Sequence, residues 1–193
     1  FGVLVATPNA TLNASTLTLG TSAASTLEFQ GVNSTTTAAL TAGTLTVNGP
    51  VTVNVTSGNL VAGQNYPLLA YTTLAGSGSF TLGTLPRGVT ATLNTSASPI
   101  TLQVSAVSPL VWNGDVSAVW DIGTTANWKN SGGSGLTYAN YPADLVQFDD
   151  TLTANPAVTL NTTVSPGSVT FVNNSTSYSL TGTGSLTGSG GLN

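Results

Sequence analysis

The sequence predicts an all-β protein made of many short strands. Apolar and polar residues alternate in short runs along most of the chain, which is the pattern of strands with one buried face. The β-branched residues Thr and Val are abundant in these runs, whereas the helix formers Glu, Lys and Arg are nearly absent. Gly, Asn, Ser and Pro separate the runs, and these are the residues of turns.

The expected strands follow one another from the first residues to the last. In the first half, alternation is found in 17–19, 27–29, 45–47, 51–55, 80–82 and 100–104. In the second half, it is found in 146–148, 158–160, 169–171 and 180–186. The centres of the runs lie roughly ten residues apart, a spacing typical of β-sandwiches, barrels and solenoids.

Two architectures fit this pattern. A sandwich or barrel would use hairpins, for which Asn48-Gly49 and Asn113-Gly114 are suitable turns. A parallel β-solenoid would stack short strands in rungs around an apolar axis, with ladders of Asn, Ser and Thr outside. We favour the solenoid because the alternating runs are only three residues long, the charge is low, and Gly and Ser separate the runs. The β-sandwich is the alternative.

The composition excludes several classes of chemistry. The 193 residues include no Cys, His or Met, so a thiol nucleophile, an imidazole base, a zinc finger and a disulfide are all excluded. Arg87 and Lys129 are the two basic residues, too few to follow a nucleic acid backbone or to hold anionic lipid. No run of 18 apolar residues is present, so we expect no membrane insertion by this segment. We therefore expect neither an enzyme nor a nucleic acid partner.

Composition also changes along the chain. A Thr-rich segment at 1–108 has few aromatics, and an irregular module at 109–157 has all three Trp. Five of the six acidic residues also lie in that module. The segment 158–193 is again rich in Thr, Ser and Gly. We expect three parts with these boundaries, the last being the start of a further β-strand repeat. The chain begins and ends within the pattern, which indicates a piece of a longer polypeptide.

The aromatic residues of the middle module are candidate ligand-binding residues. Three Trp recur at even spacing and two Tyr follow, namely Trp112, Trp120, Trp128, Tyr138 and Tyr141. Exposed rings on one face of a strand would stack on the apolar faces of sugars, as in a carbohydrate-binding module. The competing interpretation is core packing, which is favoured because Trp is highly buried on average.

The acidic residues of the module are candidate calcium ligands. Asp144, Asp149 and Asp150 form the densest cluster, and carboxylates are ligands of calcium. Neither a D-x-D-x-D-G loop nor a nonapeptide calcium repeat is present, so turn capping is the competing interpretation. A carboxylate pair for glycoside hydrolysis is a weaker alternative. Apart from this possible calcium, no cofactor is expected.

The second half of the chain resembles a known family of bacterial repeats. The segment from Val169 to Leu192 resembles the autotransporter-associated β-strand repeat. Leu110-Val-Trp-Asn-Gly, Trp120-Asp, Asp144-Leu-Val-Gln-Phe-Asp-Asp and Val164-Ser-Pro-Gly-Ser resemble the unit that recurs between such repeats. Tyr66-Pro-Leu-Leu and Leu85-Pro-Arg-Gly-Val-Thr resemble the end of a similar unit, so the likeness covers most of the chain.

This resemblance carries expectations about fold, place and partners. It implies a right-handed parallel β-helix in a long protein that is secreted or held at the bacterial cell surface. It further implies a structural or adhesive segment of a stalk, fibre or surface layer rather than a catalyst. Its partners would be other copies or neighbouring repeats of the same protein, and surface glycans.

Overall fold

The computed structural model describes residues 3–6, 11–20, 23–188, 190 and 192. All regular elements in this part are strands, which confirms the all-β prediction. Contacts divide the chain into two compact units. The first comprises Phe1–Leu85 and Val89–Val107, and the second comprises Pro86–Gly88 and Ser108–Asn193.

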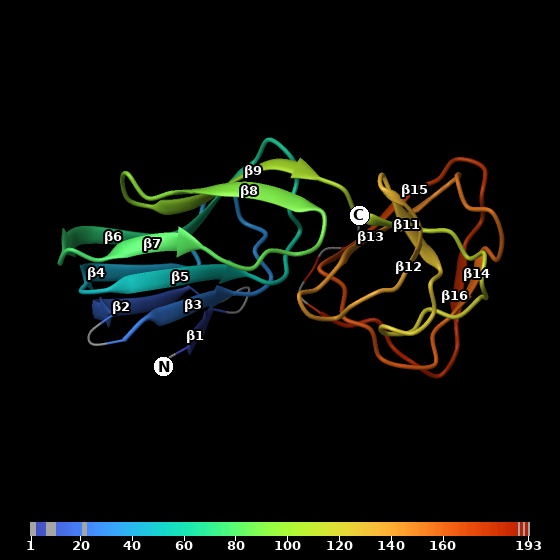
Figure 1. Cartoon of the computed structure of the whole chain (residues 1–193), viewed down its shortest axis with the longest axis horizontal. Helices are drawn as coiled ribbons and strands as arrows, with labels where there is room; N and C mark the ends of the chain where they lie inside the picture. The colour runs from blue at the N-terminus through green and yellow to red at the C-terminus, as the bar shows by residue number, and fades with distance from the viewer. Residues whose placement is uncertain (1–2, 7–10, 21–22, 189, 191, 193) are drawn as a thin grey trace. The chain divides into compact units, whose positions relative to one another are not determined.

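The first unit has two sheets between which the chain alternates (Figure 1). The four-stranded sheet has the order β1 (Val3–Ala6), β3 (Ser25–Phe29), β5 (Pro50–Val55) and β7 (Ser79–Leu82), all parallel. The five-stranded sheet has the order β2 (Leu12–Leu19), β4 (Leu40–Val47), β6 (Asn65–Ala75), β9 (Ile100–Val107) and β8 (Val89–Asn94). Of these, β2, β4 and β6 are parallel, and from β1 to β8 each strand lies in the other sheet from the strand before it.

The core of this unit is formed by columns of apolar residues at equivalent positions of successive strands. Strand β5 is the clearest case, because Val51, Val53 and Val55 are buried while the residues between them are half-exposed. In the parallel register, Leu27 of β3 lies beside Val53 of β5, and both are buried. The period-two pattern of the sequence therefore becomes a stack of apolar side chains.

The parallel order ends at a hairpin. Strand β6 pairs antiparallel with β9, which pairs antiparallel with β8. Asn48-Gly49, which a sandwich would use as a hairpin turn, does not join a hairpin, because β4 and β5 on either side of it pair with other strands. Asn113-Gly114 also does not form a hairpin turn. It follows β10 (Leu110–Trp112), but the antiparallel partner of that strand, β11 (Trp128–Asn130), begins much later in the sequence.

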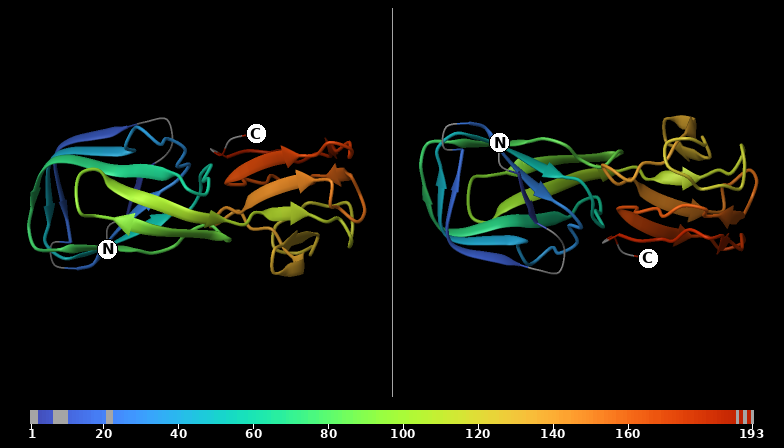
Figure 2. Two further views of the ribbon diagram at one scale, coloured as in Figure 1. Left: turned by 90° about the horizontal axis from the view of Figure 1, so that it is seen from above. Right: turned by 90° about the horizontal axis from the view of Figure 1, so that it is seen from below.

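The second unit again combines parallel strands with an antiparallel excursion. Its five-stranded sheet has the order β12 (Gly133–Leu136), β11, β10, β13 (Leu145–Asp149) and β15 (Ser168–Val172). Strands β10, β13 and β15 are parallel, and Figure 2 shows them side by side in yellow-green, orange and red. Strand β14 (Ala157–Thr159) pairs in parallel with β16 (Ser179–Thr181).

The parallel partners in the later part of this unit, from β13 onward, recur at a nearly constant separation in the sequence, whereas the parallel pairing of β10 with β13 spans a longer stretch of chain. Val158 lies beside Leu180 and Val164 beside Leu186, so these two pairs have the same separation. Val146 lies beside Val169, which in turn lies beside Leu192, and both of these steps are longer by a single position. From β13 onward, the chain thus returns to neighbouring strand positions at a nearly fixed interval.

The two compact units do not coincide with the three parts expected from the composition. The boundary expected between 108 and 109 lies next to the division at Ser108. The second expected boundary, between 157 and 158, falls inside β14 and within one compact unit. The parts 109–157 and 158–193 share one core, because residues of β13 and β15 pack in the same apolar cluster.

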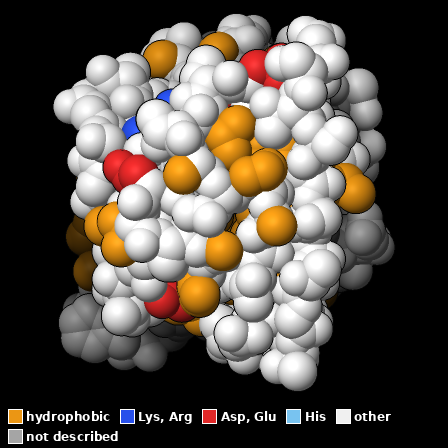
Figure 3. Space-filling model, turned by 90° about the vertical axis from the view of Figure 1, so that its right-hand side faces the viewer, with side chains coloured by type: hydrophobic (Ala, Val, Ile, Leu, Met, Phe, Trp, Pro, Cys, Tyr) orange, Lys and Arg blue, Asp and Glu red, His pale blue; other side chains and the backbone are white. Residues whose placement is uncertain are grey.

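The surface is polar but carries few charges. Figure 3 shows one face, where uncharged polar groups predominate, with small hydrophobic groups between them and few charged side chains. Among the described residues, no helix has the length and hydropathy required to cross a bilayer.

Candidate functional site

The aromatic residues singled out in the sequence form the core of the second unit. Trp112, Trp120, Trp128 and Tyr138 are all fully buried. Strands β10 and β11 pair Trp112 with Trp128, whose rings meet edge to face with centroids 5.1 Å apart. Trp120 meets Trp128 at the same centroid distance. Four of the five aromatic residues proposed as sugar-stacking residues therefore expose no ring face to a ligand.

Burial of these rings has a physical reason. The second unit contains a small number of strands, and large rings fill its interior where short aliphatic side chains would leave voids. Phe148 of β13 lies against Trp112, Trp120 and Trp128 with centroids 5.8–6.2 Å apart, and it stacks on Phe171 of β15 at 5.0 Å. The aromatic cluster thereby links the middle module to the strands that follow it.

Tyr141 is the exception among the five, since it is 61% exposed. Tyr138 precedes it closely in the sequence, but the Tyr138 ring is buried and its hydroxyl donates to Asn140 Oδ1 at 2.7 Å. Burial raises the pKa of the Tyr138 phenol. The two tyrosines therefore do not form a row of exposed rings, and the prediction of an aromatic platform in this module is wrong.

The polar atoms of the tryptophans differ in their hydrogen bonding. Trp112 Nε1 donates to the carbonyl oxygen of Asn155 at 3.0 Å. Trp120 Nε1 is buried without a hydrogen-bond partner among the described residues. A buried N–H without an acceptor costs about 1–3 kcal/mol.

Asp144 is a buried carboxylate with a single cationic partner. Its Oδ2 lies 3.1 Å from the Arg87 guanidinium, and the Asp144 and Arg87 side chains are 2% and 39% exposed, respectively. The Ala139 amide donates to the same oxygen at 2.7 Å, while Oδ1 has no hydrogen-bond partner in the described structure. Arg87 in turn donates to the Thr137 carbonyl oxygen at 3.1 Å. The pair therefore holds the segment around Arg87 against the loop that precedes β13.

The protonation of Asp144 is governed by burial. Burial raises the pKa of Asp144 to about 6, against the lowering effects of the Ala139 amide and of Arg87. Desolvation of the charged form thus outweighs the attraction of the partly exposed guanidinium. The raised pKa of Asp144 was not evident from the sequence, because neither the burial of this side chain nor its contact with the remote Arg87 follows from the local pattern.

The other two acids of the proposed calcium cluster hold turns. Asp149 accepts hydrogen bonds from the Thr151 hydroxyl and amide at 2.6 and 2.8 Å. Burial acts to raise the pKa of Asp149, but these hydrogen bonds and one from Gln147 outweigh it and lower the pKa. Asp150 accepts from the amides of three successive residues, Asn174, Ser175 and Thr176, at 2.7–3.3 Å.

The geometry gives the calcium prediction no support. Within the described part of the chain, no group of three or more acidic, His or Cys side chains gathers where an ion could be held. Asp144 forms an ion pair with Arg87, whereas Asp150 accepts hydrogen bonds from backbone amides of the loop after β15. Turn capping, the competing interpretation, describes Asp149, whereas Asp150 holds a loop that is remote in the sequence.

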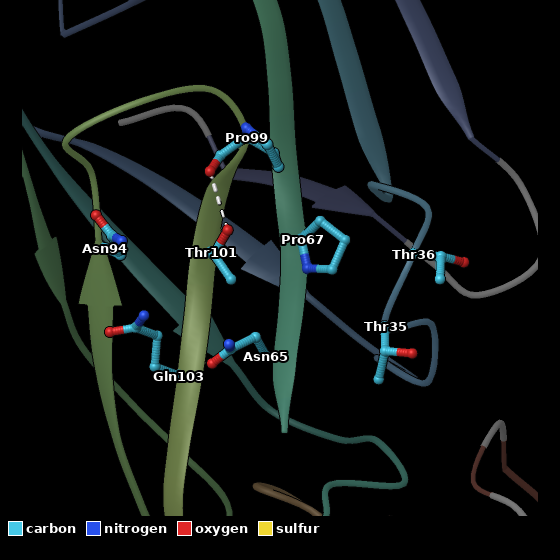
Figure 4. A pocket seen from close by; sticks show the side chains of 8 residues that line it. All are labelled: Thr35, Thr36, Asn65, Pro67, Asn94, Pro99, Thr101 and Gln103. Carbon is cyan, nitrogen blue, oxygen red and sulfur yellow. Dashed lines mark hydrogen bonds between the residues drawn. The ribbon is translucent and has the colours of Figure 1, made fainter. Parts of the chain in front are cut away.

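A groove on the first unit was not anticipated from the sequence. It has a volume of about 320 Å³ and is shown in Figure 4. Its lining consists of Thr35, Thr36, Asn65, Pro67, Asn94, Pro99, Thr101 and Gln103. No charged side chain takes part in this lining, so the groove presents amides, hydroxyls and proline rings.

The antiparallel pairing at the end of the unit creates this groove. Asn65 of β6 lies beside Gln103 of β9, and Pro67 lies beside Thr101. Thr101 also lies beside Asn94 of β8, so these side chains form two cross-strand rows on one face of the sheet. The alternation of Thr101 and Gln103 with buried residues was visible in the sequence, but the pairing with Asn65 was not.

Comparisons with known proteins identify no relative. No family model, no curated protein and no solved structure matches the chain.

Proposed function

We propose that this chain is a structural segment of an extracellular or surface-held bacterial protein, built as a right-handed parallel β-solenoid. Its role is mechanical, because stacked rungs joined by backbone hydrogen bonds form a stiff element of a stalk, fibre or surface layer. The neutral hydroxyl-rich surface keeps the segment from binding polyanions. The proposal assigns it no catalysis.

The observation that carries this proposal is the nearly constant sequence separation of the parallel partners from β13 to Leu192 in the second unit. A sandwich of antiparallel hairpins would pair strands that follow each other in the sequence. The resemblance of 110–192 to the autotransporter-associated β-strand repeat supports the same architecture and the bacterial surface.

Insertion of one additional rung tests the proposal. A second copy of 164–185, inserted after Ser185, adds the length of chain that separates Val164 from its partner Leu186. In a solenoid, the inserted rung stacks between its neighbours. The number of amides protected from hydrogen exchange therefore increases, and the tryptophan emission is unchanged. The matched control inserts the same length of Gly and Ser at that site, which adds no protected amides. An inserted rung with no more protection than this control contradicts the solenoid.

A second candidate function is recognition of a neutral glycan in the groove of the first unit. Asn65 and Gln103 lie side by side and offer donors and acceptors that match sugar hydroxyls. Titration with an array of neutral oligosaccharides is the test, in which Gln103→Ala abolishes binding and Gln64→Ala, outside the groove, does not. Absence of binding by the wild type removes this candidate.

A further inference from the structure

The groove of the first unit contains two side-chain amides that the described chain does not use. Asn65 of β6 and Gln103 of β9 are cross-strand neighbours, and neither side chain forms a hydrogen bond to another described residue. Figure 4 shows the two amides side by side. Each amide offers a carbonyl acceptor and an NH2 group with two donors. A ligand in the groove therefore meets donors and acceptors that are not already bonded within the protein.

Two other polar side chains of the same wall are already bonded to the chain. The Thr101 hydroxyl donates to the Pro99 carbonyl oxygen at 2.9 Å, as Figure 4 shows. Asn94 Oδ1 accepts from the Ser96 amide at 3.1 Å and from the Ser96 hydroxyl at 2.7 Å. Polar recognition on the wall formed by β6, β9 and β8 therefore depends chiefly on the two unbonded amides.

An apolar surface lies next to these amides. Pro67 follows Asn65 by two positions in β6, and residues two positions apart in a strand share one face. The Pro67 side chain is mostly buried and still lines the groove, so its ring contributes to the floor. Two positions along a strand correspond to about 7 Å, a distance that one sugar ring and its substituent can span.

This combination of groups restricts the chemistry of the ligand. The lining contains no charged side chain, so a charged ligand would lose hydration without gaining an opposite charge. A ligand that offers hydroxyls alone would bond to the amides but would leave the Pro67 ring against polar groups. A ligand in which an amide adjoins a methyl group bonds to the amides and covers the ring with apolar surface.

We propose that the groove selects a neutral N-acetylated sugar, whose acetamido group contacts Asn65, Gln103 and Pro67. This inference rests on the glycan recognition proposed above and names the class of sugar. The acetamido N–H donates to one side-chain carbonyl, and the acetamido oxygen accepts from the NH2 group of the other amide. The acetyl methyl covers the Pro67 ring. The sugar hydroxyls face Thr35 and Thr36, which line the groove from the loop between β3 and β4.

Two trisaccharides that differ in the acetamido group test this inference by isothermal titration calorimetry. Chitotriose carries an acetamido group on every ring, whereas cellotriose has the same linkage with a hydroxyl in its place. The wild type is expected to bind chitotriose at least about tenfold more tightly, because cellotriose loses both the amide hydrogen bonds and the buried methyl. In saturation-transfer NMR, the acetyl methyl is expected to receive the strongest transfer from the protein.

A pair of matched variants locates the site. Gln103→Leu keeps a side chain of similar size but removes its donor and acceptor, so the preference for chitotriose is expected to disappear. Gln103 is partly exposed, so the folded unit tolerates the substitution. Gln64→Leu makes the same change at an exposed residue that does not line the groove, and it is expected to keep the preference.

Several results would overturn the inference. Equal affinity of the wild type for the two trisaccharides overturns the choice of an N-acetylated sugar but leaves recognition of a neutral glycan standing. A preference for chitotriose that persists in Gln103→Leu overturns the placement of the acetamido group. Tighter binding of acetyl-trialanine amide, an uncharged peptide with the same amide and methyl groups, means that the groove takes a peptide instead. Absence of binding to both sugars removes the glycan candidate together with this inference.

Discussion

Replacement of Asp144 by Asn is expected to affect stability differently at acidic and at alkaline pH. The carboxylate is buried, has Arg87 as its partner and leaves Oδ1 without a hydrogen-bond partner in the described structure. Asn keeps the size of the side chain and an oxygen that accepts from the Ala139 amide. It removes the charge that burial disfavours.

The magnitude follows from the pKa. Burial raises the pKa of Asp144 from 3.8 to about 6 in the folded protein. Between these values the folded state holds a proton that the unfolded state has lost, so the free energy of unfolding decreases as pH rises through this window. A difference of about two pKa units corresponds to about 3 kcal/mol. Relative to the wild type, Asp144→Asn is thus expected to gain about 3 kcal/mol between about pH 3.5 and pH 8.

Urea unfolding followed by tryptophan fluorescence measures this difference. All three Trp are buried in the second unit, so their emission reports the unit that contains Asp144. Both proteins are compared at the acidic and the alkaline pH, and the change in their difference isolates the carboxyl group. Arg87→Ala serves as a control, because loss of the cation raises the Asp144 pKa further and extends the loss of stability to higher pH than in the wild type.

Two results would refute the reasoning. An unchanged difference between the two proteins at both pH values would mean that Asp144 titrates alike in the folded and unfolded states. A relative loss of stability for Asp144→Asn at alkaline pH would mean that the Arg87 ion pair outweighs burial.

Three further predictions concern the second unit. Gly182 has a positive φ and a Cβ there would meet a backbone carbonyl, so Gly182→Ala is expected to lower the unfolding free energy by at least about 1–2 kcal/mol in urea titrations. Trp112→Phe is expected to cost about 1 kcal/mol more than Trp120→Phe by the same measurement, because only the first breaks a hydrogen bond. Asp150→Asn is expected to speed amide exchange at 174–176 at neutral pH. Since hydrogen bonds from those amides lower the Asp150 pKa, its stabilisation is present at neutral pH and is lost as pH falls below the ordinary aspartate pKa of 3.8.

The strands could be predicted from sequence because burial with period two is a local property. Val51, Val53 and Val55 alternate with polar residues, and the structure buries these three. Pairing could not be predicted in the same way, since it depends on residues far apart. Asn48-Gly49 has the local chemistry of a hairpin turn, but the strands beside it pair in parallel with strands that lie elsewhere in the sequence.

The arrangement of the candidate site residues could be predicted from the sequence even less well than the pairing of the strands. The three Trp were identified by their spacing, but spacing alone did not distinguish a solvent-facing row from a core, and the structure buries all three. The groove joins Asn65 to Gln103 across two strands, and no single segment of sequence contains both. Asp144 was singled out as a candidate calcium ligand, whereas the structure pairs it with a cationic side chain that the sequence did not connect to it.

The sparsely charged surface has a consequence for the conditions under which this protein works. Between about 0.01 M and 1 M salt the screening length shrinks from about 30 Å to about 3 Å, and interactions between surface charges fade accordingly. The apolar column that Val51, Val53 and Val55 contribute to the core of the first unit has no such interaction to lose. Apolar burial strengthens on warming from the cold instead. The packing of these strands is therefore expected to persist in dilute and in concentrated salt alike.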